Sequence, residues 1–100
     1  MSSACPYCER KMVDGHPWFH PTKDHVVPRS KGGKVTVTAC VTCNQDKADM
    51  ELAEFYAALR RMGDERADII ERTIRQACEA HPDLLDEFYA VAQASTRRII

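Results

Sequence analysis

The chain has 100 residues, of which 44% are hydrophobic and 29% are charged, and its formal net charge at pH 7 is −1. This composition is ordinary for a soluble globular protein and excludes a low-complexity chain. No apolar run approaches the roughly 20 residues that span a bilayer, which excludes a transmembrane helix. The length predicts one domain, residues 1–100. A domain of this size is small enough that a disulfide or a structural metal would help to stabilise it.

The first residues, 1–6, lack the basic and apolar regions of a signal peptide, so we expect a cytoplasmic protein with no membrane partner. Residues 1–48 hold seven Lys or Arg against four Asp or Glu, whereas residues 49–100 hold seven against eleven. The basic excess therefore accompanies the cysteines and histidines, and the acidic excess lies on the second half. Taken alone, this imbalance fits either a nucleic-acid partner or ordinary solvated faces.

Proline and glycine residues punctuate residues 1–34, which favours turns and short strands over continuous helix. Two β-rich segments follow, at residues 22–27 and 35–41. They flank residues 29–34, whose turn composition predicts a hairpin with a loop longer than two residues.

Helical periodicity replaces this pattern after residue 44. Gly63 is the expected end of a first helix, Asp64 the expected cap of a second, and Pro82 a residue in the first turn of a third. We therefore predict a core over residues 1–62 and a helical extension of two to three helices over residues 63–100. The apolar residues that recur at helical spacing before Gly63 are Leu52, Phe55, Tyr56 and Leu59.

Four of the five cysteines form two Cys-x-x-Cys pairs, Cys5 with Cys8 and Cys40 with Cys43. Each such turn directs two sulfurs to one side, so two facing pairs make a tetrahedral site for Zn2+. Four thiolates leave no open position, and this zinc would be structural. Disulfides or a redox-active pair are the alternatives, which a reducing compartment disfavours. Cys78, on an apolar helical face, fits a small buried hydrophobe better than a reactive thiol.

Asp24 and His25 have side chains of the kinds that phosphodiester hydrolysis needs. A carboxylate is a hard oxygen ligand suited to Mg2+, and a histidine can remove a proton from an attacking water. Neighbouring residues on a strand point to opposite faces, so a β-bulge is expected if both are to reach one phosphate. Without further context, the dipeptide fits a surface hydrogen-bond pair equally well.

The segment before this dipeptide contains two histidines and two aromatic residues. His16 and His20 could replace a cysteine at zinc or contact a substrate, although ordinary loop histidines fit better. Trp18 and Phe19 could stack on a base, although covering a small core is their commoner role.

The segment from Asp24 to Gly33 reads Asp-His-Val-Val-Pro-Arg-Ser-Lys-Gly-Gly, and Ala39-Cys-Val-Thr-Cys-Asn-Gln-Asp-Lys47 follows it. Together they resemble the signature of the HNH endonucleases, in the branch where a Cys-x-x-Cys pair flanks each side of the motif. The resemblance covers about residues 5–48. It implies an α+β fold, with a small ββα-metal core stapled by a structural four-cysteine zinc site, and catalysis with Mg2+ or another divalent ion such as Mn2+ or Ni2+.

The resemblance also implies roles for individual residues. His25 matches the general base that activates water, while Asp24 and Asn44 match the two ligands of the catalytic ion. Lys47, one turn past Asn44, fits a phosphate contact or a solvated lysine equally well. Gly32 and Gly33 would let the loop backbone approach a substrate closely. The basic residues expected to contact DNA phosphates are Arg29, Lys31, Lys34 and Lys47.

One position departs from the motif. The middle Asn, which braces the loop between the strands, is expected five residues before Cys40, where this chain has Val35. Valine has no polar side-chain group with which to bridge the loop, and Thr36 or Thr38 would have to substitute.

The leading hypothesis is therefore a metal-dependent HNH endonuclease that hydrolyses phosphodiester bonds in DNA. A double-strand cut needs two such sites, which favours a homodimer or a place in a larger phage or restriction assembly. The alternative is a non-catalytic zinc module that binds nucleic acid or a protein partner. Val35 and the acidic tail favour this alternative, whereas the presence of Asp24, His25 and Asn44 together argues against it. A purely structural zinc domain would leave the basic Gly-Gly loop unexplained.

Overall fold

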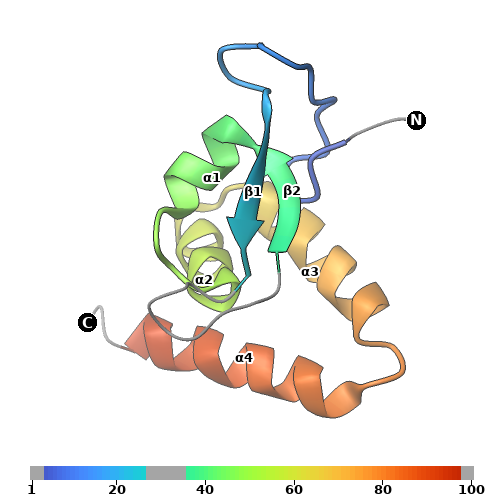
Figure 1. Cartoon of the computed structure of the whole chain (residues 1–100). Coiled ribbons are helices and arrows are strands. Elements are labelled where there is room, and N and C mark those ends of the chain that lie inside the picture. The colour runs from blue at the N-terminus through green and yellow to red at the C-terminus, as the bar shows by residue number, and fades with distance from the viewer. Residues whose placement is uncertain (1–3, 27–35, 98–100) are drawn as a thin grey trace. The chain divides into compact units, whose positions relative to one another are not determined.

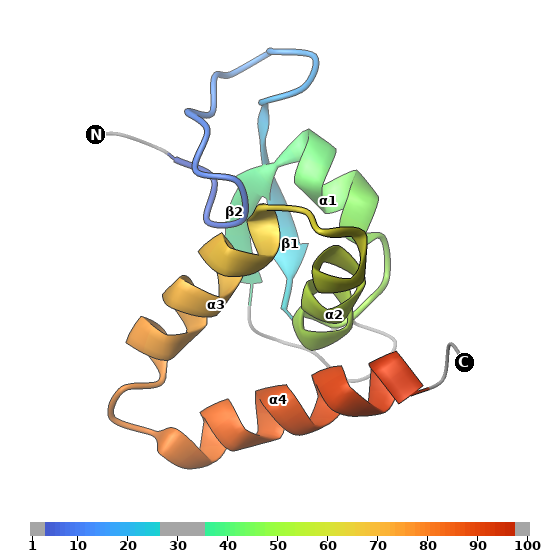
Figure 2. The same cartoon turned by 180° about the vertical axis from the view of Figure 1, so that it is seen from behind.

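The structure, a computed structural model, describes residues 4–26 and 36–97 (Figures 1 and 2). The predicted α+β class is confirmed, because the described residues form a two-stranded antiparallel sheet and four helices. None of these helices has both the length and the apolarity that a bilayer crossing requires. The elements in chain order are β1 (Pro21–His25), β2 (Thr36–Cys40), α1 (Val41–Lys47), α2 (Leu52–Met62), α3 (Arg66–Ala77) and α4 (Pro82–Arg97).

The chain divides into two compact units, Met1–Leu52 and Ala53–Ile100. The first contains the sheet, α1 and all four paired cysteines, and the second contains nearly all of α2 together with α3 and α4. The one-domain organisation, with a core over 1–62 and an extension over 63–100, stays a prediction.

In the first unit β1 and β2 form the expected hairpin (Figure 1). Their register is regular from Pro21↔Cys40 to His25↔Thr36, so the described strands lack the expected bulge. Instead β1 ends in a bend at Val26, whose carbonyl accepts a hydrogen bond from the Leu52 amide at 3.0 Å. The hairpin loop, residues 27–35, lies outside the described residues. Helix α1 follows β2 directly and packs against both strands.

In the second unit, two of the predicted helix boundaries are confirmed. Gly63 follows the last residue of α2 with φ 70°, a backbone conformation that glycine adopts without a steric penalty, and Pro82 is the first residue of α4. The expected cap of α3 differs in detail, because Glu65 is the N-cap residue and makes no side-chain capping bond. Asp64, one residue earlier, accepts the Arg66 amide hydrogen at 2.9 Å and performs the same task.

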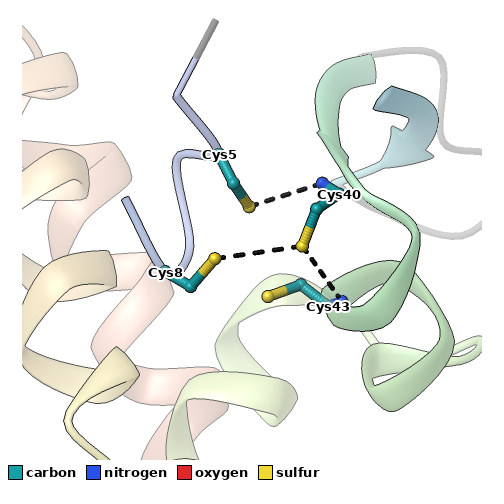
Figure 3. Close-up of side chains that lie close together, drawn as sticks. All are labelled: Cys5, Cys8, Cys40 and Cys43. Atoms are coloured by element: carbon teal, nitrogen blue, oxygen red, sulfur yellow. Dashed lines mark hydrogen bonds between the residues drawn. The ribbon is translucent and has the colours of Figure 1, made fainter. Parts of the chain in front are cut away.

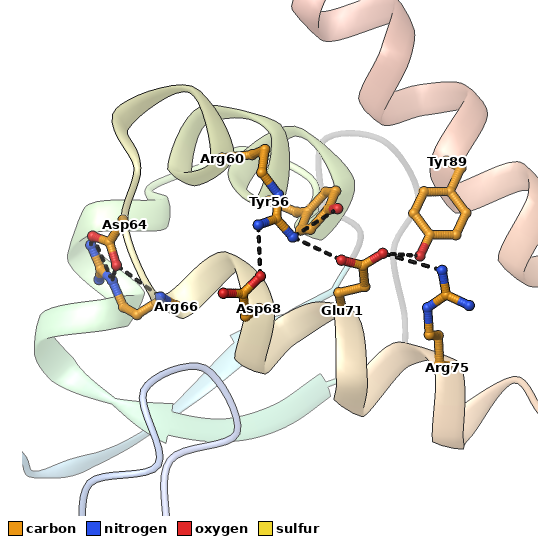
Figure 4. A network of polar contacts seen from close by, with 8 residues as sticks. All are labelled: Tyr56, Arg60, Asp64, Arg66, Asp68, Glu71, Arg75 and Tyr89. Atoms are coloured by element: carbon orange, nitrogen blue, oxygen red, sulfur yellow. Dashed lines mark hydrogen bonds and ion pairs between the residues drawn. The ribbon is translucent and has the colours of Figure 1, made fainter.

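A polar network joins the three helices of the second unit (Figure 4). Glu71 of α3 accepts hydrogen bonds from Arg60 of α2 at 2.8 Å and from the Tyr89 hydroxyl of α4 at 2.6 Å. The guanidinium of Arg60 also pairs with Asp68 at 2.7 Å. Hydrogen bonds from the Tyr89 hydroxyl and the Arg75 guanidinium hold the pKa of Glu71 below its usual range. The buried residues of this unit are Ala53, Phe55, Tyr56, Ala57, Leu59, Ala67, Ile70 and Ala92.

Candidate metal centre and reacting centre

The four paired cysteines converge in the first unit, as predicted (Figure 3). Their sulfurs all lie within 4.8 Å of one another, and the Sγ atoms of Cys8 and Cys40 are 3.9 Å apart. A tetrahedral zinc with Zn–S bonds of about 2.3 Å requires sulfurs about 3.8 Å apart, so this cluster is of the right size. Cys5, Cys40 and Cys43 are buried and Cys8 is half-buried. The donor set and its spacing fit a closed four-sulfur site that holds a metal such as zinc.

Local backbone structure explains how the second pair is presented. Cys40 is both the last residue of β2 and the N-cap of α1, where its sulfur accepts the Cys43 amide hydrogen at 3.5 Å. The sulfur of Cys5 accepts amide hydrogens from Cys40 at 3.4 Å and from Tyr7 at 3.5 Å. Backbone N–H groups that point at a sulfur favour its thiolate, which is the form that binds metal. A side-chain hydrogen bond with Cys43, together with these amides, lowers the pKa of Cys5 to about 4.

The first pair lies in a tight loop, Ala4 to Lys11, which we call the knuckle loop. The loop is closed by a bridge between Ala4 and Lys11 and by a hydrogen bond from the Cys5 amide to the Arg10 carbonyl at 2.9 Å. Glu9 adopts φ 64°, an unusual conformation for a residue other than glycine, and its amide donates to the Cys5 carbonyl at 2.8 Å. The loop is thereby folded so that both of its sulfurs face the second pair.

The rings of His16 and His20 accept hydrogen bonds from the backbone of their own loop. The Nδ1 atom of His16 accepts the amide hydrogens of Trp18 and Phe19, each at 3.1 Å, and Nδ1 of His20 accepts that of Gly15 at 2.8 Å. Among the described residues the candidate metal cluster consists of the four cysteines, so the two histidines are not part of it. Trp18 is 65% exposed and so does not cover the core of this unit.

Asp24 lies at the centre of a buried polar cluster. Its side chain is 4% exposed, and each carboxylate oxygen has its own partner. Oδ1 pairs with the ammonium of Lys47 at 3.2 Å, and Oδ2 accepts the Tyr7 hydroxyl hydrogen at 2.5 Å. The Lys47 ammonium also donates to the His25 carbonyl at 2.7 Å. A charge is stable at this depth only because such partners replace the lost water.

Lys47 is therefore not the solvated lysine that its sequence position allowed, since its side chain is 1% exposed. Burial is the main reason that the pKa of the Tyr7 hydroxyl is raised far above its usual value, and the Asp24 carboxylate adds to the effect. The phenol consequently keeps its proton and remains a donor. In the described part of the chain, no buried side-chain nitrogen or oxygen lacks a hydrogen-bond partner.

Asn44 lies on α1 one turn before Lys47 and faces the same strand. Its Nδ2 donates to the Thr22 hydroxyl oxygen at 3.0 Å and to the Lys23 carbonyl at 3.2 Å. Thr22 already donates its own hydrogen to the Ala39 carbonyl at 2.8 Å, so it acts as an acceptor toward Asn44. These contacts fix which end of the amide carries the oxygen, and Oδ1 is the end left to accept or to bind a cation.

His25 is the last residue of β1 and is half-buried. Alternation along the regular strand directs its ring away from the face that carries Asp24. The structure thus brings Asp24, Asn44 and Lys47 together between β1 and α1 and places His25 at the end of the same strand, beside the bend at Val26.

Tyr7 is the residue that sequence reasoning missed. It stands between two cysteines, and its position identified it only as an apolar residue near a metal. One signal was available, because a buried tyrosine hydroxyl nearly always finds a polar partner. The remaining predicted residues, Arg29, Lys31, Lys34 and Val35, with Gly32 and Gly33, lie outside the described residues.

The hairpin, the short helix packed on it and the four-cysteine cluster define a small α+β protein with a cysteine site that could bind zinc. The sequence profile of one family, described as HNH endonuclease, matches residues 5–59, which is more than half of the chain. The chain belongs to the HNH endonuclease family, and nucleic acid is the class of substrate that membership implies. No curated protein and no solved structure matched the chain.

Proposed function

We propose that the protein is a metal-dependent endonuclease that hydrolyses phosphodiester bonds in DNA, with a reacting centre at the end of β1. The observation that carries the proposal is the packing of α1 on β1, which places Asn44 beside Thr22 and Lys47 beside Asp24. Two residues with oxygen ligands therefore lie on facing elements within a unit that matches a nuclease family.

The chemistry of these residues fits a divalent ion. A carboxylate has about four lone-pair sites, and Asp24 uses one on each oxygen for Tyr7 and Lys47. Asn44 contributes the amide oxygen that its hydrogen bonds leave available. Mg2+, or an ion such as Mn2+ or Ni2+, prefers oxygen ligands of this kind and would supply stabilisation of negative charge on the scissile phosphate.

In this proposal His25 is the general base, which accepts the proton of the attacking water at a ring nitrogen. Its backbone is fixed by the Lys47 ammonium at its carbonyl and by pairing with Thr36. Arg29, Lys31 and Lys34 are proposed to contact DNA phosphates from the hairpin loop, and the direct phosphate contact of Lys47 stays a prediction. The four-cysteine centre holds zinc and takes no part in the reaction, because four thiolates leave no coordination position open.

Two observations favour the alternative, a zinc module that binds nucleic acid or a protein without cutting. Asp24 and His25 lie on opposite faces of a regular strand. The carboxylate of Asp24 is buried and already neutralised by Lys47, so it needs no divalent ion for stability. Under this alternative, Asp24, Lys47 and Tyr7 are purely a structural cluster.

Plasmid cleavage distinguishes the two functions. Supercoiled plasmid is incubated with the zinc-loaded protein and Mg2+, Mn2+ or Ni2+, with EDTA as a control, beside His25→Ala. We expect nicked or linear product that needs the added ion, and a loss of about 100-fold or more in His25→Ala, as is typical for a general base. His81→Ala is the matched control, because His81 is an exposed histidine of the second unit and its loss should leave cleavage unchanged. Intact plasmid with every ion, or equal cleavage by His25→Ala, would favour the binding module.

The assembly state is a separate proposal. A homodimer would supply two reacting centres for a double-strand cut, as would a place in a larger phage or restriction assembly. Analytical ultracentrifugation with and without DNA tests this, and a monomer that only nicks would contradict the dimer.

A further inference from the structure

Tyr7 makes a contact with each of the two candidate metal sites. Its backbone amide donates to the Cys5 sulfur at 3.5 Å, and its hydroxyl donates to Asp24 Oδ2 at 2.5 Å. A single residue thus joins a ligand of the four-cysteine centre to the carboxylate of the reacting centre. The two sites are otherwise built from different donor atoms, sulfur in one and oxygen in the other.

The connection is rigid. Tyr7 is 3% exposed, so its ring is enclosed by protein and not by solvent. The knuckle loop that carries it is closed by the hydrogen bonds from the Cys5 amide to Arg10 and from the Glu9 amide to Cys5. The enclosed ring and the closed loop therefore place the hydroxyl at Asp24 and the Cys5 sulfur from the same short segment of backbone.

We propose that Tyr7 is a positioning residue through which the four-cysteine centre fixes the Asp24 carboxylate and thereby sets the affinity of the reacting centre for its divalent ion. The inference rests on the proposed function, since it takes Asp24 as a ligand of that ion. Hydrogen-bonded partners hold metal ligands in orientation, and their loss typically weakens metal binding by about 10–100-fold. The coupling is reciprocal, so binding of an ion at the reacting centre must also change the environment of the cysteine sulfurs.

The direct test is Tyr7→Phe, which removes one oxygen atom and keeps the buried ring. Lys47 still holds Asp24 Oδ1 in this variant, so the ion pair survives. Mn2+ binding to the zinc-loaded protein is measured by electron paramagnetic resonance, which needs no cleavage activity. We expect the Mn2+ dissociation constant to rise by about 10–100-fold while the zinc content and the far-ultraviolet circular dichroism stay unchanged.

Tyr56→Phe is the matched control. It removes the same atom from another buried tyrosine, whose hydroxyl accepts a hydrogen bond from Arg60 in the second unit at 3.3 Å. We expect its Mn2+ affinity to equal that of the wild type. Equal affinities in the wild type and Tyr7→Phe would overturn the inference and leave the proposed function standing. Wild-type protein that binds no Mn2+ would overturn both, and equal weakening in the two variants would overturn the inference alone.

A second measurement uses the wild-type chain and does not depend on whether Tyr7→Phe folds. Cadmium replaces zinc at the four cysteines, because thiolates bind soft ions well, and its NMR resonance reports on the sulfur ligands. Addition of Mg2+, which prefers oxygen ligands, should shift this resonance in the wild type and in Tyr56→Phe. An unmoved resonance at an Mg2+ concentration that supports cleavage would overturn the inference.

Discussion

Lys47→Met removes the ammonium of a buried ion pair while it keeps a side chain of similar length. The side chains of Lys47 and Asp24 are 1% and 4% exposed, so water cannot replace the lost charge. Asp24 would keep only the Tyr7 hydroxyl, and the His25 carbonyl would lose its donor at 2.7 Å. Breaking a buried pair by removing one partner typically destabilises a protein by about 3–5 kcal/mol. We expect a loss of this size in the first unit.

The assay is urea unfolding of the zinc-loaded protein, with zinc release to a colorimetric chelator as the signal. Because all four cysteines belong to the first unit, zinc release reports on that unit. A loss of about 4 kcal/mol, divided by a urea dependence of about 2 kcal/mol/M, lowers the midpoint by about 2 M. Lys23→Met is the matched control, since Lys23 is an exposed lysine on β1, and its effect should stay within about 0.5 kcal/mol.

A double-mutant cycle separates the ion pair from other effects of the substitution. Asp24→Asn alone leaves the Lys47 ammonium without its carboxylate, whereas Asp24→Asn with Lys47→Met removes both charges. The double variant should therefore lose about 1–3 kcal/mol less than the sum of the single variants. Additive losses, or a Lys47→Met midpoint close to that of the wild type, would refute the reasoning, because either result means that the pair contributes nothing when buried.

Three further predictions concern other parts of the chain. Metal analysis of the wild type should find about one zinc per chain, and replacement of Cys40 and Cys43 by Ser should abolish it; a zinc-free wild type, or zinc retained by the variant, would contradict the four-sulfur site. Glu71→Gln should lower the stability of the helical unit by about 1 kcal/mol, measured by urea unfolding followed by circular dichroism. Because the folded-state pKa of Glu71 is depressed, this contribution is fully present above the ordinary value of 4.5 and is lost as pH falls through the folded pKa. A gap between variant and wild type that does not narrow as pH falls below 4.5 would contradict it. His16→Ala removes the acceptor of two amide hydrogens, and hydrogen exchange at Trp18 and Phe19 should become at least several-fold faster, with unchanged rates counting against the loop geometry.

The cysteine cluster could be predicted from sequence because its geometry is local. A Cys-x-x-Cys turn directs two sulfurs to one side whatever the rest of the fold, so two pairs suffice to predict a four-sulfur centre. The end of α2 and the start of α4 were equally predictable, because Gly63 and Pro82 act through their own backbone preferences. The start of α1 could not be predicted in this way. It begins at Val41, before the change of period at residue 44, because the Cys40 sulfur caps a helix too short for an apolar period to show.

The polar cluster could not be predicted because its members have no spacing motif and meet only in the fold, whereas each cysteine pair is marked by its own motif. Tyr7 and Asp24 are 17 residues apart, and Asp24 and Lys47 are 23 residues apart. A lysine spaced one turn from Asn44 has the same sequence signature whether it faces water or an opposing strand. Its burial follows from two oxygen acceptors, one on Asp24 and one on His25, that only the packing of α1 on β1 brings together.

The elements that carry the proposed reacting centre are too short to be stable alone, and a metal bound by the adjacent four cysteines would hold them together. A two-stranded hairpin is at best marginally stable in water, and a helix of seven residues is shorter than isolated helices that persist. Cys40 pairs with Pro21 at the start of β1, and Cys43 lies in the first turn of α1, so one metal fixes both elements that meet at Asp24. Structural zinc supplies about 10–16 kcal/mol of binding free energy in zinc-finger peptides, which is as large as the whole stability of a typical domain. If zinc binds there, we expect its removal to loosen the contacts of Asn44 and Lys47 with β1, on which the proposed chemistry depends.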